Sequence, residues 1–267
     1  MEPYPYWQQQ KPDQPLFPDV QWNKPSQRSQ AGRLGIVGGN KLGFAGVAEA
    51  YSQALQAGAG EVRVLLPDSL RKTIPASITD AVFGATTFSG GLGKAAVSEL
   101  HALGTWATGI LLVGDAGRNS ETAILYEQFL TDYHGPLTIT RDAVDLLKQS
   151  GQQVVDRPET LLVVSFAQLQ KLFTQVYYPK ILTFSMQLAA LVEMLHKFTI
   201  TYPVTIMVLH KDHLAVASAG SVTTTPWQHP LAIWRGSVAA RAASYWLWTP
   251  YAALQAATTS LCVGPDQ

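Results

Sequence analysis

A strand–helix–strand unit near the start of the chain limits the possible folds most strongly. The segment Arg33–Asn40, RLGIVGGN, is a short apolar run that ends in paired glycines, which indicates a buried strand followed by a tight turn. The next segment, AGVAEAYSQALQAGAG, places Val47 and Tyr51 on one helical face, and Gly58 predicts the end of the helix. The segment Glu61–Pro67, EVRVLLP, is a second strand. Because such a unit joins parallel strands, the sequence predicts a parallel sheet with covering helices.

The same alternation continues along the chain and ends in a hairpin. Further strands are predicted at 109–114, 136–140, 159–165 and 204–210, and further helices at 119–130, 141–149, 166–173, 184–198 and from 237 onward. Ser120 and Ser237 are each predicted to cap a helix, and the segment from His229 to Arg235 is expected as strand or loop. The segment HLAVASAGSVTTT is predicted to turn at Ala219-Gly220. The pattern predicts an α/β fold with a mostly parallel central sheet and helices on both faces.

The chain has 267 residues, of which 47% are hydrophobic and 14% are charged, and this composition fits a large buried core. No internal repeat and no strong linker divides it, so we expect one domain over residues 31–267. Residues 1–30 are rich in proline and glutamine and are expected to form an extended arm. The aromatic residues of this arm predict that parts of it pack on a surface.

Charge and cysteine content exclude several classes of function. The net charge is zero, which argues against nucleic acid or an anionic membrane as a partner. A single cysteine, Cys262, excludes an internal disulfide framework and favours the cytoplasm. The start of the chain lacks the pattern of a secretion signal. Residues 242–265 carry no charge, but Pro250 and several hydroxyl residues interrupt them, so two packed helices are expected rather than a membrane span.

Glycine turns follow several predicted strands, at 38–40, 89–94 and 114–117. Ligands bind at such strand ends in doubly wound sheets, although tight turns alone also require glycine. The segment GGLGKA is not a phosphate-binding P-loop, because Phe88 stands in place of its first glycine and Ala95 in place of its serine or threonine. The GIVGGN segment lacks the dinucleotide-binding spacing.

The sequence contains neither a histidine spacing typical of a metal site nor the motif that surrounds many catalytic serines. None of the six histidines lies in an H-E-x-x-H pattern, and no metal site is predicted. A G-x-S-x-G nucleophile motif is also absent. Asp142 follows a predicted strand, where a functional carboxylate and a helix cap are equally good interpretations.

Four segments together resemble the ADP/ATP-dependent NAD(P)H-hydrate dehydratases, a family with the ribokinase-like fold. They are RLGIVGGNKLGFAGVAEAYSQALQAGAG, GRNSETAI, LTITRDAVDLLK and WRGSVAARAA. The resemblance covers residues 24–260 in order and spacing rather than in identical motifs. It implies a ribokinase-like three-layer sandwich and repair of hydrated NAD(P)H, with ADP or ATP and Mg²⁺ as cofactors. It also implies self-association, often as a tetramer.

The resemblance assigns roles to individual residues. Gly46, Gly117 and Ser165 would contact the substrate, and His210, Lys211, Arg235 and Gly236 would contact the nucleotide. Ser237 stands in the place of the catalytic aspartate, and Asp142 aligns with a family aspartate.

The departures from the family pattern fall at positions on which the family's catalysis and phosphate binding depend. The Ser237 hydroxyl stays protonated near neutral pH, and loss of a general base costs about 10²–10⁴-fold in rate. VSFAQ replaces a family segment that contains histidine and glutamate, and PWQHP replaces an Asn-Pro-Gly loop. Asp115 replaces a glycine and brings a negative charge to an expected anion site.

These departures predict a diverged homologue that has lost normal catalysis and acts as a nucleotide-binding or interaction protein. Its ligand would be a nucleotide or an NAD(P)H-derived small molecule. The alternative is an active hydrate dehydratase or small-molecule kinase with a relocated base, for which Asp115, Asp142 and Asp212 are the candidates. Aromatic residues of the last helices, such as Trp246 and Trp248, favour either a homo-oligomer contact or packing in the core.

Overall fold

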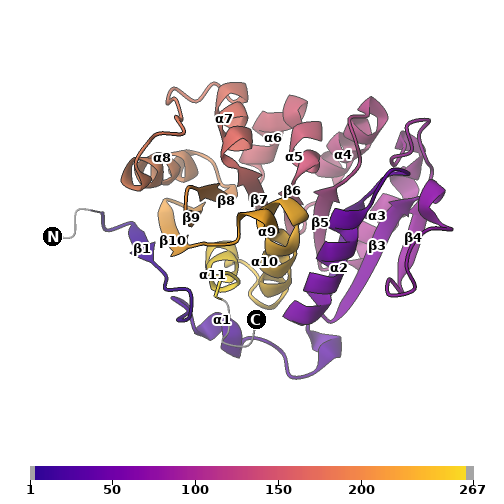
Figure 1. The fold of residues 1–267 in the computed structure, drawn as a ribbon, viewed down its shortest axis with the longest axis horizontal. Coiled ribbons are helices and arrows are strands. Elements are labelled where there is room, and N and C mark those ends of the chain that lie inside the picture. Colours follow the sequence, from indigo (N-terminus) through magenta and orange to yellow (C-terminus); the bar gives the residue numbers. More distant parts are fainter. Residues whose placement is uncertain (1–3, 263–267) are drawn as a thin grey trace.

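The computed structural model describes residues 4–262, and its centre is a ten-stranded sheet (Figure 1). The strand order is β1-β10-β9-β8-β7-β6-β5-β2-β3-β4, and neighbours are parallel except in the β8-β9 and β9-β10 pairs. The strands are β1 Trp7–Gln9, β2 Arg33–Gly38, β3 Glu61–Pro67, β4 Ala81–Gly84, β5 Gly109–Gly114, β6 Leu137–Thr140, β7 Thr160–Ser165, β8 Thr205–His210, β9 His213–Ser218 and β10 Ser221–Pro226.

Helices cover both faces of this sheet, which gives three layers. The helices are α1 Asp19–Trp22, α2 Ala45–Ala57, α3 Val97–Trp106, α4 Ser120–Asp132, α5 Asp142–Leu146, α6 Gly151–Asp156, α7 Phe166–Gln175, α8 Leu188–Thr201, α9 Pro230–Arg235, α10 Ser237–Trp248 and α11 Ala253–Thr259. The core on one face includes residues of α3 to α8, and the core on the other includes residues of α2, α9, α10 and α11. The predicted α/β sandwich with helices on both faces is confirmed.

The central strands are apolar along their whole length because both of their faces are covered. In β5, Ile110 and Leu112 belong to the core under α3 to α8, whereas Leu111 and Val113 belong to the core under α2 and α10. The hairpin is also confirmed, since Ala219 and Gly220 form the turn between β9 and β10.

Three local predictions are wrong. The cap of α4 is Asn119 rather than Ser120, because the Asn119 side chain accepts hydrogen bonds from the backbone N–H groups of Glu121 and Thr122. The helix predicted from residue 184 begins at Leu188. Residues 230–235, expected as strand or loop, form α9, which has proline at its first position and left-handed Gly236 after its last.

The N-terminal arm packs against the edge of the sheet, as its aromatic residues predict. Strand β1 pairs with β10, and the Trp7 indole N–H donates to Thr224 Oγ1 at 2.9 Å. The Tyr6 ring stacks on the His196 ring of α8 with 3.6 Å between the centroids. The arm therefore covers the backbone edge that β10 would otherwise expose.

Gln10 anchors this arm, and its loss gives a testable prediction. Its side chain is 2% exposed, donates to the Thr258 carbonyl at 2.6 Å and accepts from the Leu16 N–H at 3.0 Å. Gln10→Ala is expected to lower the free energy of unfolding by about 1–3 kcal/mol, because buried polar groups lose their partners. Urea unfolding would measure this loss, with exposed Gln8→Ala as the control. Equal stability of the two variants would contradict the anchoring role.

The aromatic residues of the last helices divide between core and surface. Trp246 and Trp248 are buried within the subunit, and the Trp248 N–H donates to the Ala31 carbonyl at 3.2 Å. Tyr251 is 91% exposed. Within the uncharged stretch, the described residues 242–262 include the rest of α10 and all of α11, and both helices pack on the sheet. Among the described residues, no helix has the length and hydropathy needed to span a bilayer.

Candidate functional site

Several of the predicted site residues meet at the carboxyl edge of the sheet, beyond β2, β5 and β6. The positions of two glycines show how close these segments lie. A Cβ atom on Gly236 would lie 3.6 Å from the Gly46 carbonyl oxygen and 3.5 Å from Arg141 Cδ. The start of α2, the end of β6 and the α9-α10 junction therefore converge. Residues that the sequence separates by almost 200 positions become neighbours because parallel strands end at one edge.

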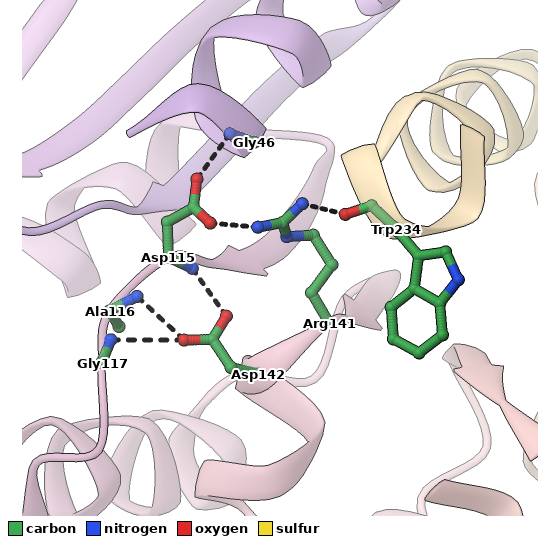
Figure 2. A network of polar contacts seen from close by, with 7 residues as sticks. All are labelled: Gly46, Asp115, Ala116, Gly117, Arg141, Asp142 and Trp234. Carbon is green, nitrogen blue, oxygen red and sulfur yellow. Dashed lines mark hydrogen bonds and ion pairs between the residues drawn. The ribbon is translucent and has the colours of Figure 1, made fainter. Parts of the chain in front are cut away.

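The side chain of Asp142, the first residue of α5, lies in the glycine turn that follows β5. Its carboxylate accepts hydrogen bonds from the backbone N–H groups of Asp115 at 2.6 Å, Ala116 at 3.1 Å and Gly117 at 3.2 Å (Figure 2). Three converging N–H groups are the kind of concave donor set that binds anions. In this chain an internal carboxylate fills it.

Burial raises the pKa of the Asp142 carboxyl above its ordinary value, and the nearby Asp115 charge acts in the same direction. The hydrogen bond from the Asp115 backbone N–H and the charge of Arg141 oppose this rise. Asp142 begins α5 and does not cap it; Arg141 holds the cap position.

Asp115 belongs to the turn after β5, and its carboxylate lies against the start of α2 and forms an ion pair with Arg141. One of its carboxylate oxygens accepts the Gly46 N–H at 2.5 Å, and the other forms an ion pair with the Arg141 guanidinium. The negative charge predicted near an anion site is thus present. It lies on the positive end of the α2 dipole.

Arg141 joins three segments of the edge. Its guanidinium contacts Asp115 and also donates to the Trp234 carbonyl of α9, as Figure 2 shows. The Arg141 backbone has a φ of 56°, a conformation that L-residues rarely adopt. Its own carbonyl accepts the Gln168 side-chain amide at 2.7 Å, and this amide also donates to Asp145 at 2.8 Å. Neighbouring segments therefore hold both the guanidinium and the backbone of Arg141.

Ser237 is the first residue of α10, and its side chain does not cap that helix. The cap position belongs to Gly236, which has a φ of 88°, so the interpretation of Ser237 as a helix cap is wrong. The Ser237 hydroxyl donates to the Ala232 carbonyl at 2.9 Å, and the residue is 9% exposed. Arg235 is exposed in the last turn of α9.

The remaining predicted residues lie at the ends of β7 and β8, the next strands after β6 along the same sheet. Ser165 caps α7 in a reciprocal pair with Gln168, which accounts structurally for the hydroxyl. His210 is buried, and its Nε2 bonds to the Met186 carbonyl at 2.9 Å, where the Lys211 ammonium also donates. His210 and Lys211 thus fasten the loop before α8.

A cleft of about 550 Å³ opens over this edge. It is lined by Asn40, Leu42, Gly43, Ala45, Asp115, Gly117, Arg141, Asp142, Asp145, Gln168 and Trp234. Sequence reasoning missed Arg141 and Asp145, and it assigned no contact to Gln168 or Trp234. The position of Arg141 directly after a strand is the one signal that could have identified any of them. Among residues 4–262, no group of three or more His, Cys, Asp and Glu residues is arranged to hold a metal ion.

Asp212 lies apart from the cleft lining, on the turn between β8 and β9. Its side chain is 81% exposed and bonds to the His213 ring at 2.9 Å. The hydrogen bond from His213 lowers the pKa of the Asp212 carboxyl. A general base needs the opposite adjustment, toward neutral pH, so of the three candidate bases Asp142 has the most suitable surroundings.

Comparison with solved structures identifies the fold. No protein-family model and no curated protein sequence matches the chain. A ribokinase-like superfamily protein from Enterococcus faecalis is similar over 96% of this chain and 86% of its own length, with a TM-score of 0.72 and 15% identity. An ADP/ATP-dependent NAD(P)H-hydrate dehydratase from Bacillus subtilis, co-crystallised with ATP and Mg²⁺, is similar over 89% of this chain and 79% of its own, with a TM-score of 0.57 and 9% identity.

A hydroxyethylthiazole kinase from Pyrococcus horikoshii is also similar, over 92% of this chain and 80% of its own, with a TM-score of 0.58 and 11% identity. At these low sequence identities, the similarity to these structures shows the fold alone. The chain has the ribokinase-like α/β fold, which its sequence resemblance implies.

Proposed function

We propose that this chain, which has the ribokinase-like fold, binds a nucleotide or an NAD(P)H-derived small molecule without the phosphoryl-transfer chemistry of a kinase or a hydrate dehydratase. The proposal combines the cleft at the sheet edge with the chemical state of the residues that line it and of Ser237, which follows Gly236 at the same edge. It is a proposal of binding without turnover.

The hydroxyl of Ser237 is the observation that carries this proposal. It stands where the family resemblance places the catalytic aspartate, at the first position of α10. Its proton is directed to the Ala232 carbonyl at 2.9 Å. A neutral hydroxyl donor cannot take a proton from a substrate at neutral pH, so the step that a carboxylate would perform has no agent at this position.

Two carboxylates of the cleft, Asp142 and Asp115, support the same conclusion because both are already bound by the protein. Asp142 accepts three backbone N–H groups, and Asp115 accepts the Gly46 N–H and the Arg141 guanidinium. A phosphoryl group in the course of transfer would need donors of this kind, and the chain's own carboxylates already satisfy them.

The second candidate function is an active enzyme that uses Asp142 as a relocated base. Two observations favour it: Asp142 lines the cleft, and burial raises the pKa of its carboxyl toward the range in which a general base works best. An enzyme of this kind would act on a hydroxyl group of a small molecule, with ADP or ATP as the phosphate donor.

Incubation with hydrated NADH and either ADP or ATP, in the presence of Mg²⁺, separates the two candidates. We expect no recovery of NADH absorbance above the background without protein. Turnover that disappears in Asp142→Asn but persists in exposed Asp132→Asn would overturn the proposal. Circular dichroism of both variants would establish that they are folded, so that lost activity is not merely lost structure.

Binding itself is measured by the shift in melting temperature with millimolar ADP, ATP or AMP. A ligand that binds the folded state at 100 times its Kd stabilises it by about 2.7 kcal/mol. We expect at least one nucleotide to raise the melting temperature, and Ser237→Ala to respond as the wild type does. If no nucleotide shifts the transition, the chain is a scaffold without a nucleotide site.

A further inference from the structure

We propose that the Asp115 carboxylate is an autoinhibitory occupant of an anion site formed by the Gly46 N–H and the Arg141 guanidinium, and that a tetrahedral oxyanion of the phosphate class binds there when Asp115 moves away. This inference rests on the proposed binding function and adds a regulation to it. The ligand class follows from the donors that meet at the site.

Two independent donors converge on Asp115 from different parts of the chain. Gly46 lies in the first turn of α2, a helix of 13 residues, where the backbone N–H groups lack partners within the helix. Arg141 follows β6 and supplies a fixed positive charge. A helix start and a guanidinium are together a strong site for an oxyanion.

The site is built for a close approach of charged groups to the backbone. A Cβ atom at position 46 would lie 2.8 Å from Arg141 Cζ and 2.8 Å from Asp115 Oδ2, so it would push these two charged groups away from their present positions. Glycine therefore allows the anion and the cation to lie directly against the start of α2.

The site also has a donor that Asp115 does not use. The Arg141 Nε is buried and has no hydrogen-bond partner within the part of the chain that the structure describes. A carboxylate presents two oxygens, and both already have donors. A phosphate presents more oxygens, so it could use this donor after a small rotation of the guanidinium.

Asp115 can release the site without disturbing the turn that carries it. The Asp142 carboxylate holds the Asp115 backbone N–H at 2.6 Å, which is independent of the Asp115 side chain. Rotation about χ1 is therefore enough to move the carboxylate into the adjoining cleft, which both Asp115 and Arg141 line. The side chain is 15% exposed and lies next to solvent.

Replacement of Asp115 tests the proposal. Its φ of 54° suits glycine, so Asp115→Gly is expected to keep the fold while it empties the site. Inorganic phosphate would be titrated at constant ionic strength, with the backbone amide resonance of Gly46 as the local readout. We expect Asp115→Gly to bind phosphate about tenfold or more tightly than the wild type, and Asp115→Gly/Arg141→Gln to lose this gain.

A matched pair of variants separates occupancy from overall charge. Asp115→Asn and Asp145→Asn each remove one negative charge from the same cleft, but Asp145 contacts Gln168 and Lys171 rather than Gly46. Only Asp115→Asn is expected to strengthen phosphate binding and to shift the Gly46 resonance. Equal effects of the two variants, or no gain in Asp115→Gly, would overturn the autoinhibitory role. Nucleotide-dependent melting of the wild type tests the proposed function separately.

Discussion

Replacement of Gly114 with alanine is expected to cost more stability than the other glycine substitutions in the same turn. Gly114 has a φ of 91°, which an L-residue adopts only at a cost of about 1–2 kcal/mol. Its added Cβ would also lie 1.9 Å from Asp142 Oδ1 and 2.9 Å from the Ala143 nitrogen. The Asp142 carboxylate would have to leave its three backbone donors, at about 1–3 kcal/mol for each buried group left unpaired. We expect a total loss of about 3 kcal/mol or more.

Gly117→Ala is the matched control for this prediction. Gly117 lies in the same turn with a φ of 72°, but its added Cβ would meet only the Asn40 side-chain nitrogen, at 3.2 Å. The expected cost is about 1 kcal/mol, which is the cost of the backbone conformation alone. Urea unfolding of both variants would measure the difference. If the two lose equal stability, the collision with Asp142 does not determine the effect.

Asp142→Ala is expected to have the second largest effect, for the opposite structural reason. Here the turn remains intact, but its three backbone N–H groups lose their acceptor. Because these groups are partly buried, we expect the free energy of unfolding to fall by about 2–4 kcal/mol. Asp142→Asn keeps one acceptor oxygen and is expected to lose less than Asp142→Ala.

Hydrogen exchange gives this prediction a local readout. The amide protons of Asp115, Ala116 and Gly117 should exchange faster in Asp142→Ala. The exchange rates of amide protons in the central strands should change only as far as the global free energy of unfolding changes. Asp132→Ala is the control, since its side chain is 44% exposed and pairs with the partly exposed His101 ring, and we expect a change within about 1 kcal/mol. Unchanged protection of the turn in Asp142→Ala would refute the anchoring role of this carboxylate.

The candidate site divides into features that were visible in the sequence and features that were not. The hydroxyl at Ser237 and the negative charge at Asp115 could be predicted, because each follows from the residue type at one position. The contact between Asp115 and Arg141 could not, since 26 positions separate the two residues and no periodicity links them. The positive φ of Arg141 and the helix that holds Trp234 were equally hidden.

The sequence by itself determined the alternation of the main strands and helices and the coverage of both sheet faces, but it did not reveal β1, β4, α3 or α9. Hydrophobic periodicity is local, so segments such as Arg33–Gly38 and Gly109–Gly114 show their buried strands wherever they are placed. Only the tertiary structure decided which N–H groups face which carboxylates. That choice depends on the register in which β2 and β5 pair, which shifts between Val37 and Gly38, and on where β6 ends beside them. Hydrogen bonds across a sheet edge act over a few ångströms, so their partners are set by this register and not by distance along the chain.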